Sequence, residues 1–257
     1  RSELQKKIKK INKLNPDILC VLFDDMRGDK ADLALIQSKI IDHISQHSNS
    51  EHLIVCPSYY SEDPLLDKVF GPRPPQYLED IGRLISSEMS IFWTGTKVCS
   101  VNFSSNEITR ITQVLDRKPF IWDNYPVNDG ANMCHHLHLK EFSGREKLTQ
   151  DNIAGHAVNP MNQSWLSRIP IATIIDDKNK PRKNTYQAIN EMCGPILASQ
   201  IVKDLELFHS TGIASISRQE RESLLKAYRE MQQSPYTIEI IEWLKGSYQF
   251  DPNCLTD

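Results

Sequence analysis

Apolar positions follow two alternating periods along the first part of the chain. Isoleucines and leucines recur every three or four residues among lysines over 4–14, which is the spacing of an amphipathic helix. A continuous apolar run at 18–23 follows, after a turn at 15–17 that contains asparagine and proline. A short apolar run of this kind, bounded by turn residues, is typical of a strand. The pattern therefore predicts a helix, a turn and a strand.

The same pairing of a helical pattern with a short apolar run recurs as far as Pro160. Helical spacing is found at 36–44, 78–85 and 108–114, and apolar runs lie at 53–56, 91–93, 119–122 and 153–158. Alternating helices and strands favour a parallel sheet, and its crossovers are almost always right-handed. The pattern predicts a series of βα units.

The pattern changes after Asn159. Residues 164–177 favour a closing helix over one more strand, and 178–184 form a polar break. Apolar residues at helical spacing continue from Tyr186 onward and predict a small helical lobe. We therefore expect two parts, a strand-and-helix part at 1–182 and a helical region at 183–257.

Composition narrows the class of protein. The chain has 257 residues, of which 39% are hydrophobic, enough for one sizeable core. The net charge is -3 without a basic stripe, so nucleic acid is not an expected partner. No apolar run approaches the length of a membrane span, and residues 1–10 form a charged helix rather than a signal peptide. The sequence predicts a soluble protein with no membrane partner.

The cysteines indicate a reducing environment. There are six, they form no close pair, and most fall inside apolar runs. Buried, reduced thiols are the expected state of such residues. This favours a cytoplasmic location. The six are Cys20, Cys56, Cys99, Cys134, Cys193 and Cys254.

Polar or special residues stand where each predicted strand ends. The most informative are Asp24 and Asp25, which directly follow an apolar run. The other ends are Tyr59-Tyr60, Thr94-Gly95, Asp123-Asn124 and Asn159-Pro160. In a (β/α) barrel such ends open on one face, where substrates bind. The pattern predicts one pocket lined by five strand ends, although two adjacent acids alone also suit a helix cap or a Mg²⁺ site.

Five short motifs along the chain together resemble glycoside hydrolase family 84, the O-GlcNAcases and related bacterial β-N-acetylglucosaminidases. They are Leu22-Phe23-Asp24-Asp25, Cys56-Pro57-Ser58-Tyr59-Tyr60, Trp93-Thr94-Gly95, Trp122-Asp123-Asn124 and Asn159-Pro160. Five motifs in order at βα spacing are far more specific than one alone. The resemblance implies a glycoside hydrolase without a metal or other cofactor that acts on terminal β-linked GlcNAc of a protein or glycan.

The resemblance also implies a fold and a departure from it. In that family the acid pair ends the fourth strand of a (β/α)8 TIM-type barrel. The chain would then be the C-terminal portion, strands 4 to 8, followed by a small helical region. A whole barrel needs about 250 residues, whereas the barrel part here stops near residue 177. We expect the first three strands to come from the same or another chain, with a lysine and backbone groups that hold the sugar hydroxyls.

By resemblance, the two acids have different roles in substrate-assisted hydrolysis. The oxygen of the sugar's own 2-acetamido group attacks the anomeric carbon and forms an oxazoline-like intermediate. Asp24 is expected to accept the acetamido N–H, while Asp25 protonates the leaving oxygen and later activates water. We expect Asp25 to be protonated at rest, since a neighbouring carboxylate raises one apparent pKa of the pair.

The resemblance assigns further residues to the acetamido pocket. Tyr60 lies near the acetamido oxygen, Cys56 belongs to the pocket wall, and Thr94 and Val98 line the same pocket. Trp122 offers an apolar wall for the acetamido methyl group and the sugar ring. These are expectations, because each residue type is also common in an ordinary core or loop.

Three polar residues complete the expected site. Asn124 lies beside the acid and the sugar, Asp129 accepts hydrogen bonds from distal hydroxyls, and Asn159 assists it. Gly130 stands where the family often has an aromatic residue, and Lys140-Glu141 replaces a common Gly-Pro pair. These departures predict a different pocket rim and a differently shaped loop.

Three alternatives remain open. Three imidazoles and a thiol at 134–138 could hold Zn²⁺, but a second ligand pair with suitable spacing is missing, so a solvated loop is favoured. The acid pair could serve Mg²⁺-dependent phosphotransfer, which predicts loss of activity with a chelator. The chain could also be an inactive sugar-binding or scaffolding remnant, and coding sequence upstream would discriminate this from an enzyme.

Overall fold

The computed structural model of the protein describes residues 2–174, 182–248 and 250. Its internal contacts divide these residues into two compact units. The first comprises the chain up to Asp123 together with Gly144–Ala157, and the second comprises Asn124–Ser143 and the described residues after Ala157. The predicted division into 1–182 and 183–257 stays a prediction. Residues 175–181, just before this boundary, are outside the described part.

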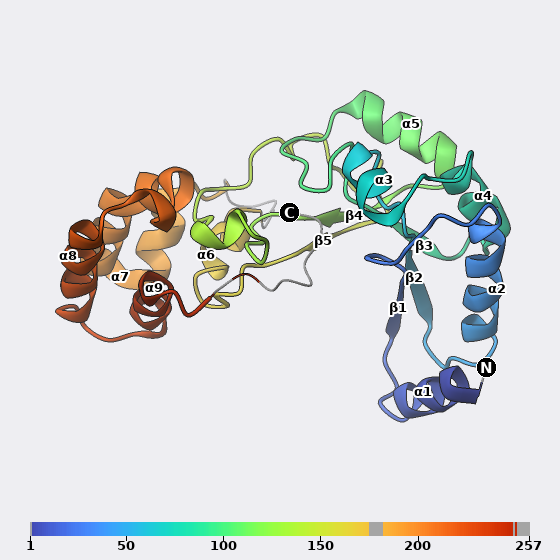
Figure 1. Ribbon diagram of the computed structural model, residues 1–257, viewed down its shortest axis with the longest axis horizontal. Helices are drawn as coiled ribbons and strands as arrows, with labels where there is room; N and C mark the ends of the chain where they lie inside the picture. Colours follow the sequence, from blue (N-terminus) through green and yellow to red (C-terminus); the bar gives the residue numbers. More distant parts are fainter. Residues whose placement is uncertain (1, 175–181, 249, 251–257) are drawn as a thin grey trace. The chain divides into compact units, whose positions relative to one another are not determined.

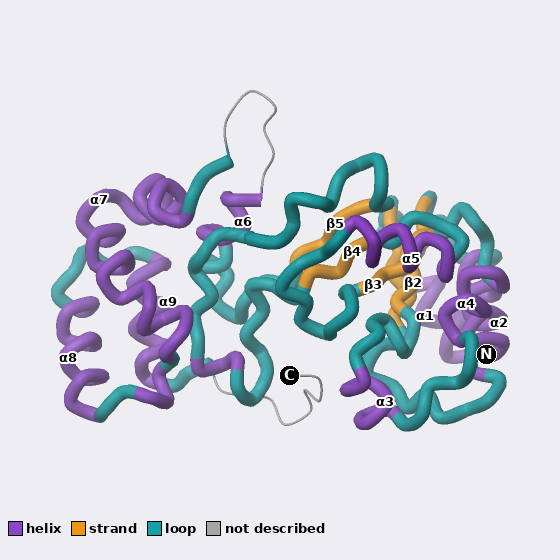
Figure 2. Tube along the Cα trace, turned by 90° about the horizontal axis from the view of Figure 1, so that it is seen from above, coloured by secondary structure: helices purple, strands orange, loops and turns teal. Residues whose placement is uncertain are grey.

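One sheet of five strands organises the first unit, in the order in which the strands follow one another in sequence. They are β1 (Ile18–Leu22), β2 (His52–Cys56), β3 (Ser90–Trp93), β4 (Phe120–Asp123) and β5 (Gly155–Val158). Neighbouring strands from β1 to β4 are parallel. Figures 1 and 2 show them side by side with helices on the connections. The predicted α/β half-barrel is confirmed in this coarse form, while the strand numbers 4 to 8 stay a prediction.

The helices of the first unit follow the predicted spacing. They are α1 (Ser2–Asn12), α2 (Leu33–Ser45), α4 (Tyr77–Leu84) and α5 (Ser105–Leu115). A reciprocal capping box starts α5, since the Ser104 hydroxyl accepts from the Glu107 backbone and the Glu107 carboxylate accepts from the Ser104 backbone. The short α3 (Pro64–Phe70) was not predicted, and it begins where the Asp63 carboxylate accepts a hydrogen bond from the Leu65 backbone.

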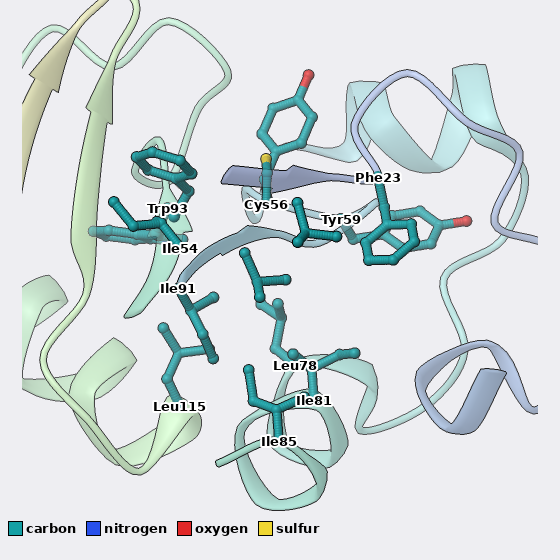
Figure 3. Packing of buried hydrophobic residues seen from close by; sticks show 14 of the residues in the cluster. Phe23, Ile54, Cys56, Tyr59, Leu78, Ile81, Ile85, Ile91, Trp93 and Leu115 are labelled. Carbon is teal, nitrogen blue, oxygen red and sulfur yellow. The ribbon is translucent and has the colours of Figure 1, made fainter. Parts of the chain in front are cut away.

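The core of the first unit lies between the sheet and helices α4 and α5. Leu78 and Ile81 of α4 point toward the sheet in Figure 3. Ile81, Ile91 and Leu115 are fully buried. A side chain at Gly82 would place its Cβ 2.5 Å from the Leu115 carbonyl oxygen, so glycine permits the close approach of α4 and α5. This packing holds one face of the strands rigidly.

The second unit is helical and has its own core. It contains α6 (Arg168–Ile174), α7 (Thr185–Glu206), a π-helical turn (Leu207–Thr211), α8 (Arg218–Arg229) and α9 (Pro235–Lys245), with short 3₁₀ turns at Met133–His135 and Ile213–Ser215. The predicted closing helix is present over α6, and its residues 175–177 lie outside the described part. The ring of Phe208 packs edge-to-face against Trp243 in the middle of this unit.

Two further expectations can be compared with the described residues. Cys20, Cys56, Cys99, Cys134 and Cys193 are free thiols, and Cys254 lies outside the described part. Among the helices that the structure describes, none combines the length and apolar character that crossing a bilayer requires.

Candidate active site

Backbone hydrogen bonds extend the parallel pairing beyond the ends of the first three strands. The Phe23 N–H donates to the Cys56 carbonyl at 2.9 Å, and the Thr94 N–H donates to the Tyr60 carbonyl at 3.0 Å. These bonds tie the motif after β1 to the motif at β2, and the motif at β2 to the motif after β3. The first unit therefore brings three of the predicted motifs to one edge of the sheet.

The acid pair lies directly after β1, and its two members have different surroundings. Asp24 is half-buried, whereas Asp25 is exposed. Asp25 has φ 56°, a left-handed conformation that aspartate tolerates better than most residues. Burial raises the pKa of Asp24, although a hydrogen bond from its own backbone opposes the shift. The predicted protonation of Asp25 at rest stays a prediction.

The thiol of Cys56, at the end of β2, is affected by the charges of the acid pair. Burial raises the pKa of its thiol well above the ordinary value, and the negative charges of Asp24 and Asp25 raise it further. Both carboxyl groups are therefore within electrostatic reach of the Cys56 sulfur. A thiol in this state stays protonated near neutral pH and is not a nucleophile, and its predicted place in the pocket wall stays a prediction.

The other predicted residues of the acetamido pocket are buried at the same edge. Tyr60, Thr94 and Val98 are 5%, 2% and 5% exposed. The Thr94 hydroxyl donates to the Lys97 carbonyl at 3.0 Å, and the Val98 N–H donates to the Asp63 carboxylate at 3.3 Å. These bonds fix the loop after β3, so its side chains can form a pre-shaped wall.

Trp122 comes from β4 and is half-buried. Its ring packs edge-to-face against Phe92 of β3, with 5.0 Å between the ring centroids. The contact fixes the orientation of the indole and leaves part of it accessible. This arrangement suits an apolar platform for a sugar.

The remaining three predicted residues lie in the second unit. The Asn159 amide donates to the Asn124 side-chain oxygen at 3.0 Å, a contact that was not predicted, and the predicted assistance of Asp129 by Asn159 stays a prediction. Asp129 is exposed, and its buried neighbour Asn128 donates to the His136 carbonyl at 2.9 Å. Seven predicted residues are thus in the first unit and three in the second. A single pocket containing all ten stays a prediction.

A buried ion pair behind the end of β4 was not predicted. Both carboxylate oxygens of Asp123 accept hydrogen bonds from the Arg145 guanidinium, at 2.9 and 2.5 Å, and His156 Nε2 lies 3.0 Å from one of them. Arg145 also donates to the carbonyls of Ser100 and Val101. These hydrogen bonds connect β4, β5 and the loop after β3. Asp123 directly follows Trp122 in the sequence.

The electrostatics of Asp123 make this group sensitive to acid. Burial by itself would raise the pKa of Asp123, but the hydrogen bonds and charges of Arg145 and His156 outweigh it and lower the pKa. A carboxyl group with a lowered folded-state pKa contributes stability above its unfolded pKa of about 3.9. That contribution is lost as the pH falls through the lowered value.

Removing the arginine is expected to destabilise the fold strongly. Arg145→Leu leaves the Asp123 carboxylate buried without its main partner, which costs about 3–5 kcal/mol, to be measured by urea unfolding at pH 7. Arg83→Leu is the matched control, because its ion pair with Asp80 is exposed and should cost less than about 1 kcal/mol. Equal losses in both variants would contradict a structural role for the buried pair.

The histidine-rich segment 134–138 packs inside the second unit, with none of its residues exposed, so the predicted solvated loop is wrong. The His138 ring lies 6.0 Å from that of His136 and 5.6 Å from that of His209, between centroids. Burial lowers the pKa of all three imidazoles, that of His209 to about 4, so the rings are neutral near pH 7. Within 2–174 and 182–248, no three His, Cys, Asp or Glu side chains are arranged as metal ligands.

Comparison with known proteins identifies the family. The family model described as β-N-acetylglucosaminidase matches residues 1–209, most of the chain. The chain belongs to this family. All five motifs that resemble glycoside hydrolase family 84 lie within the matched residues. The match includes parts of both compact units.

Individual relatives agree with the family match. Protein O-GlcNAcase of Rattus norvegicus and that of Mus musculus are each 25% identical to this β-N-acetylglucosaminidase family member in an alignment of 182 residues that covers 67% of the chain. The chain spans only 19% of the length of either relative. An aspartate-to-asparagine variant of the Thermobaculum terrenum O-GlcNAc hydrolase has a similar fold, with a TM-score of 0.70 and 22% identity. That match covers 96% of this chain and 62% of the bacterial one.

Proposed function

We propose that the protein is a retaining β-N-acetylglucosaminidase that hydrolyses terminal β-linked GlcNAc from a protein or glycan through an oxazoline intermediate. The observation that carries the proposal is the Asp24–Asp25 pair at the end of β1, within electrostatic reach of Cys56. It occurs in a chain that matches the β-N-acetylglucosaminidase family over residues 1–209. Rodent O-GlcNAcases and a bacterial O-GlcNAc hydrolase among the similar proteins support the sugar.

The first chemical step uses the sugar's own amide. The acetamido oxygen forms a bond to the anomeric carbon, the glycosidic C–O bond breaks, and Asp25 gives its proton to the leaving oxygen. Asp24 accepts the acetamido N–H, which makes the amide oxygen more nucleophilic and stabilises the developing positive charge. The half-burial of Asp24 supports this role, since a partly desolvated carboxylate interacts more strongly with the N–H.

The second step reverses the roles of the groups. Asp25, now ionised, removes a proton from water, and the water oxygen attacks the anomeric carbon while the oxazoline ring opens. Two displacements at the same carbon return the original anomeric configuration. The exposure of Asp25 supports this step, because water and the leaving group must both reach its carboxyl oxygens.

The other predicted residues hold the sugar in our proposal. Tyr60 contacts the acetamido oxygen, while Cys56, Thr94 and Val98 form the wall around the acetamido group. The ring of Trp122 supports the methyl group and the sugar ring. Asn124 lies beside the acid and the sugar. Asp129 accepts hydrogen bonds from the distal hydroxyls, and Asn159, which donates to the Asn124 side chain, assists it.

We further propose that β1 corresponds to the fourth strand of a (β/α)8 barrel. Three preceding βα units, from the same polypeptide or another chain, would then pack beside it and supply a pocket lysine. Two features support this proposal. The first is that β1 is an edge strand, with Leu22 47% exposed, and the second is a groove beside it. A groove of about 260 Å³ lies between β1 and α1, lined by apolar side chains that include Ile8, Ile11 and Val21.

The test is hydrolysis by the full-length protein of a chromogenic β-N-acetylglucosaminide, followed by NMR of the released sugar. We expect release of the β-anomer first. The rate should fall by about 10-fold or more when the N-acetyl group of the substrate is replaced by an N-trifluoroacetyl group, since the amide oxygen is then a weaker nucleophile. A chelator should not change the rate, because the proposed steps use side chains, the substrate and water.

Three results would contradict the proposal, each in a different way. A sugar trapped as an ester of an aspartyl oxygen would replace the oxazoline by a covalent enzyme intermediate. Loss of activity with a chelator would favour Mg²⁺-dependent chemistry at the acid pair. GlcNAc binding without hydrolysis would identify a sugar-binding remnant.

A further inference from the structure

A chain of buried polar groups leads from the outer helices to the peptide that precedes the acid pair. Ser58, Tyr77 and Gln37 are 0%, 1% and 4% exposed. Ser58 lies in the loop after β2, Gln37 belongs to α2 and Tyr77 to α4. Their side chains meet inside an otherwise apolar core, where polar groups are retained only when hydrogen-bonded.

The hydrogen bonds run in one direction and end on Phe23. The Ser58 N–H donates to the Tyr77 hydroxyl at 3.0 Å, and that hydroxyl donates to the side-chain oxygen of Gln37. The Gln37 amide donates to the Ser58 hydroxyl at 2.8 Å, and the Ser58 hydroxyl donates to the Phe23 carbonyl at 2.8 Å. The Ser58 and Tyr77 hydroxyls each use their single proton, so the chain of bonds has one consistent orientation.

Phe23 is thereby held on both sides of its backbone. Its N–H donates to the Cys56 carbonyl at 2.9 Å, and its carbonyl accepts from the Ser58 hydroxyl. The Phe23 carbonyl belongs to the peptide bond that begins Asp24. Two residues later, Asp25 has φ 56°, a conformation that persists only where the surroundings determine it. The network therefore fixes the Phe23 backbone, which directly precedes the acid pair.

We propose that Ser58, Gln37 and Tyr77 are positioning residues for the Asp24–Asp25 pair. They act through the Phe23 backbone and contact neither the sugar nor the reacting atoms. The inference rests on the proposed function, since it states what keeps the two acids of that reaction in register. The network does more than fill the core, because its last acceptor is the Phe23 carbonyl, which directly precedes the acid pair.

The test compares three variants of the full-length protein on one chromogenic β-N-acetylglucosaminide. In Ser58→Ala the Phe23 carbonyl loses its donor, and in Tyr77→Phe the Ser58 N–H and Gln37 lose their partner. Displacing a catalytic group by about 1 Å costs about 100-fold, so we expect kcat to fall at least about 10-fold in both variants. KM should change less than kcat, since the residues proposed to form the wall and platform for the sugar are untouched and only the Asp24 contact is displaced.

Ser38→Ala is the matched control. Ser38 is the neighbour of Gln37 on α2, is 3% exposed, and its hydroxyl donates to the Leu35 carbonyl of its own helix at 3.0 Å. It should leave kcat unchanged and lower the melting temperature less than Ser58→Ala, because it removes one local hydrogen bond instead of two long-range ones. If kcat per folded molecule is unchanged in Ser58→Ala and Tyr77→Phe as well, the network is only structural and the inference is wrong.

Crystal structures of the wild-type and Ser58→Ala proteins separate this inference from the proposed function. The positioning role predicts that Asp24 and Asp25 shift by about 1 Å and that Asp25 leaves its left-handed conformation. If the wild-type protein does not hydrolyse the substrate, the proposed function fails, and these structures alone decide the positioning role. An acid pair that superposes in both structures overturns it.

Discussion

Replacing Asp24 by asparagine in the full-length protein is expected to slow hydrolysis of every β-N-acetylglucosaminide by about 10²–10³-fold. The substitution removes the negative charge that accepts the acetamido N–H, so the amide oxygen is less nucleophilic and the oxazoline-like transition state loses its counter-charge. The loss should be equally large for good and poor leaving groups, because the acetamido group is the same in all of them. Initial rates on a series of aryl glycosides measure it.

Asp29→Asn is the control for this prediction. Asp29 lies in the same loop, is paired with Arg27 at 2.6 Å, and has no place in the proposed chemistry. Its substitution should leave kcat within about 2-fold of wild type. A loss in Asp24→Asn that disappears for good leaving groups would give Asp24 the role of the proton donor and reverse our assignment.

Replacing Asp25 by asparagine should produce a loss that depends on the leaving group. General acid catalysis contributes about 10²–10⁴-fold, and only a basic leaving oxygen needs the proton. We therefore expect the full loss for alkyl glycosides and a near wild-type rate of bond cleavage for a dinitrophenyl glycoside. Pre-steady-state release of the phenol measures this step separately from the later attack of water, which also uses Asp25.

The slope of log rate against the pKa of the leaving group makes this prediction quantitative. It should steepen in Asp25→Asn relative to wild type, since charge then accumulates on an unprotonated oxygen. Equal losses for all leaving groups would show that Asp25 does not donate the proton.

The sequence predicted those elements whose pattern is set by burial on one or both faces. The runs at 18–23, 53–56 and 91–93 are apolar on both faces, as a parallel sheet requires, and they became β1, β2 and β3 with ends shifted by a residue or two. The helix α3 was missed because it has seven residues, of which only Leu66 and Phe70 are buried, too few to show a period.

The sequence predicted only those residues of the candidate site that belong to, or lie near, a recognisable motif. The pair Asn124 and Asn159 came from two separate motifs, and the structure joins them by a hydrogen bond. Arg145 was not predicted, because nothing in its local sequence points to Asp123, its partner 22 residues earlier. Such pairs depend on the tertiary fold, which neither periodicity nor a short motif encodes.

Ser58 shows the same limit within a motif. It was noted as part of Cys56-Pro57-Ser58-Tyr59-Tyr60, yet its bond to the Phe23 carbonyl depends on Gln37 and Tyr77. Gln37 lies within an amphipathic helix and Tyr77 opens another, where single polar groups are read as ordinary surface residues. Only the packed structure shows that these two side chains face inward.

The uncovered edge of β1 also bears on how the protein is handled in the laboratory. Ile18 and Leu22 are 52% and 47% exposed on an outermost strand, where backbone groups are available to a neighbouring molecule. Apolar edge strands of this kind are templates for intermolecular pairing and aggregation. Concentrated preparations of the chain alone therefore favour self-association through this strand, and a lysine at either position is the natural gatekeeper.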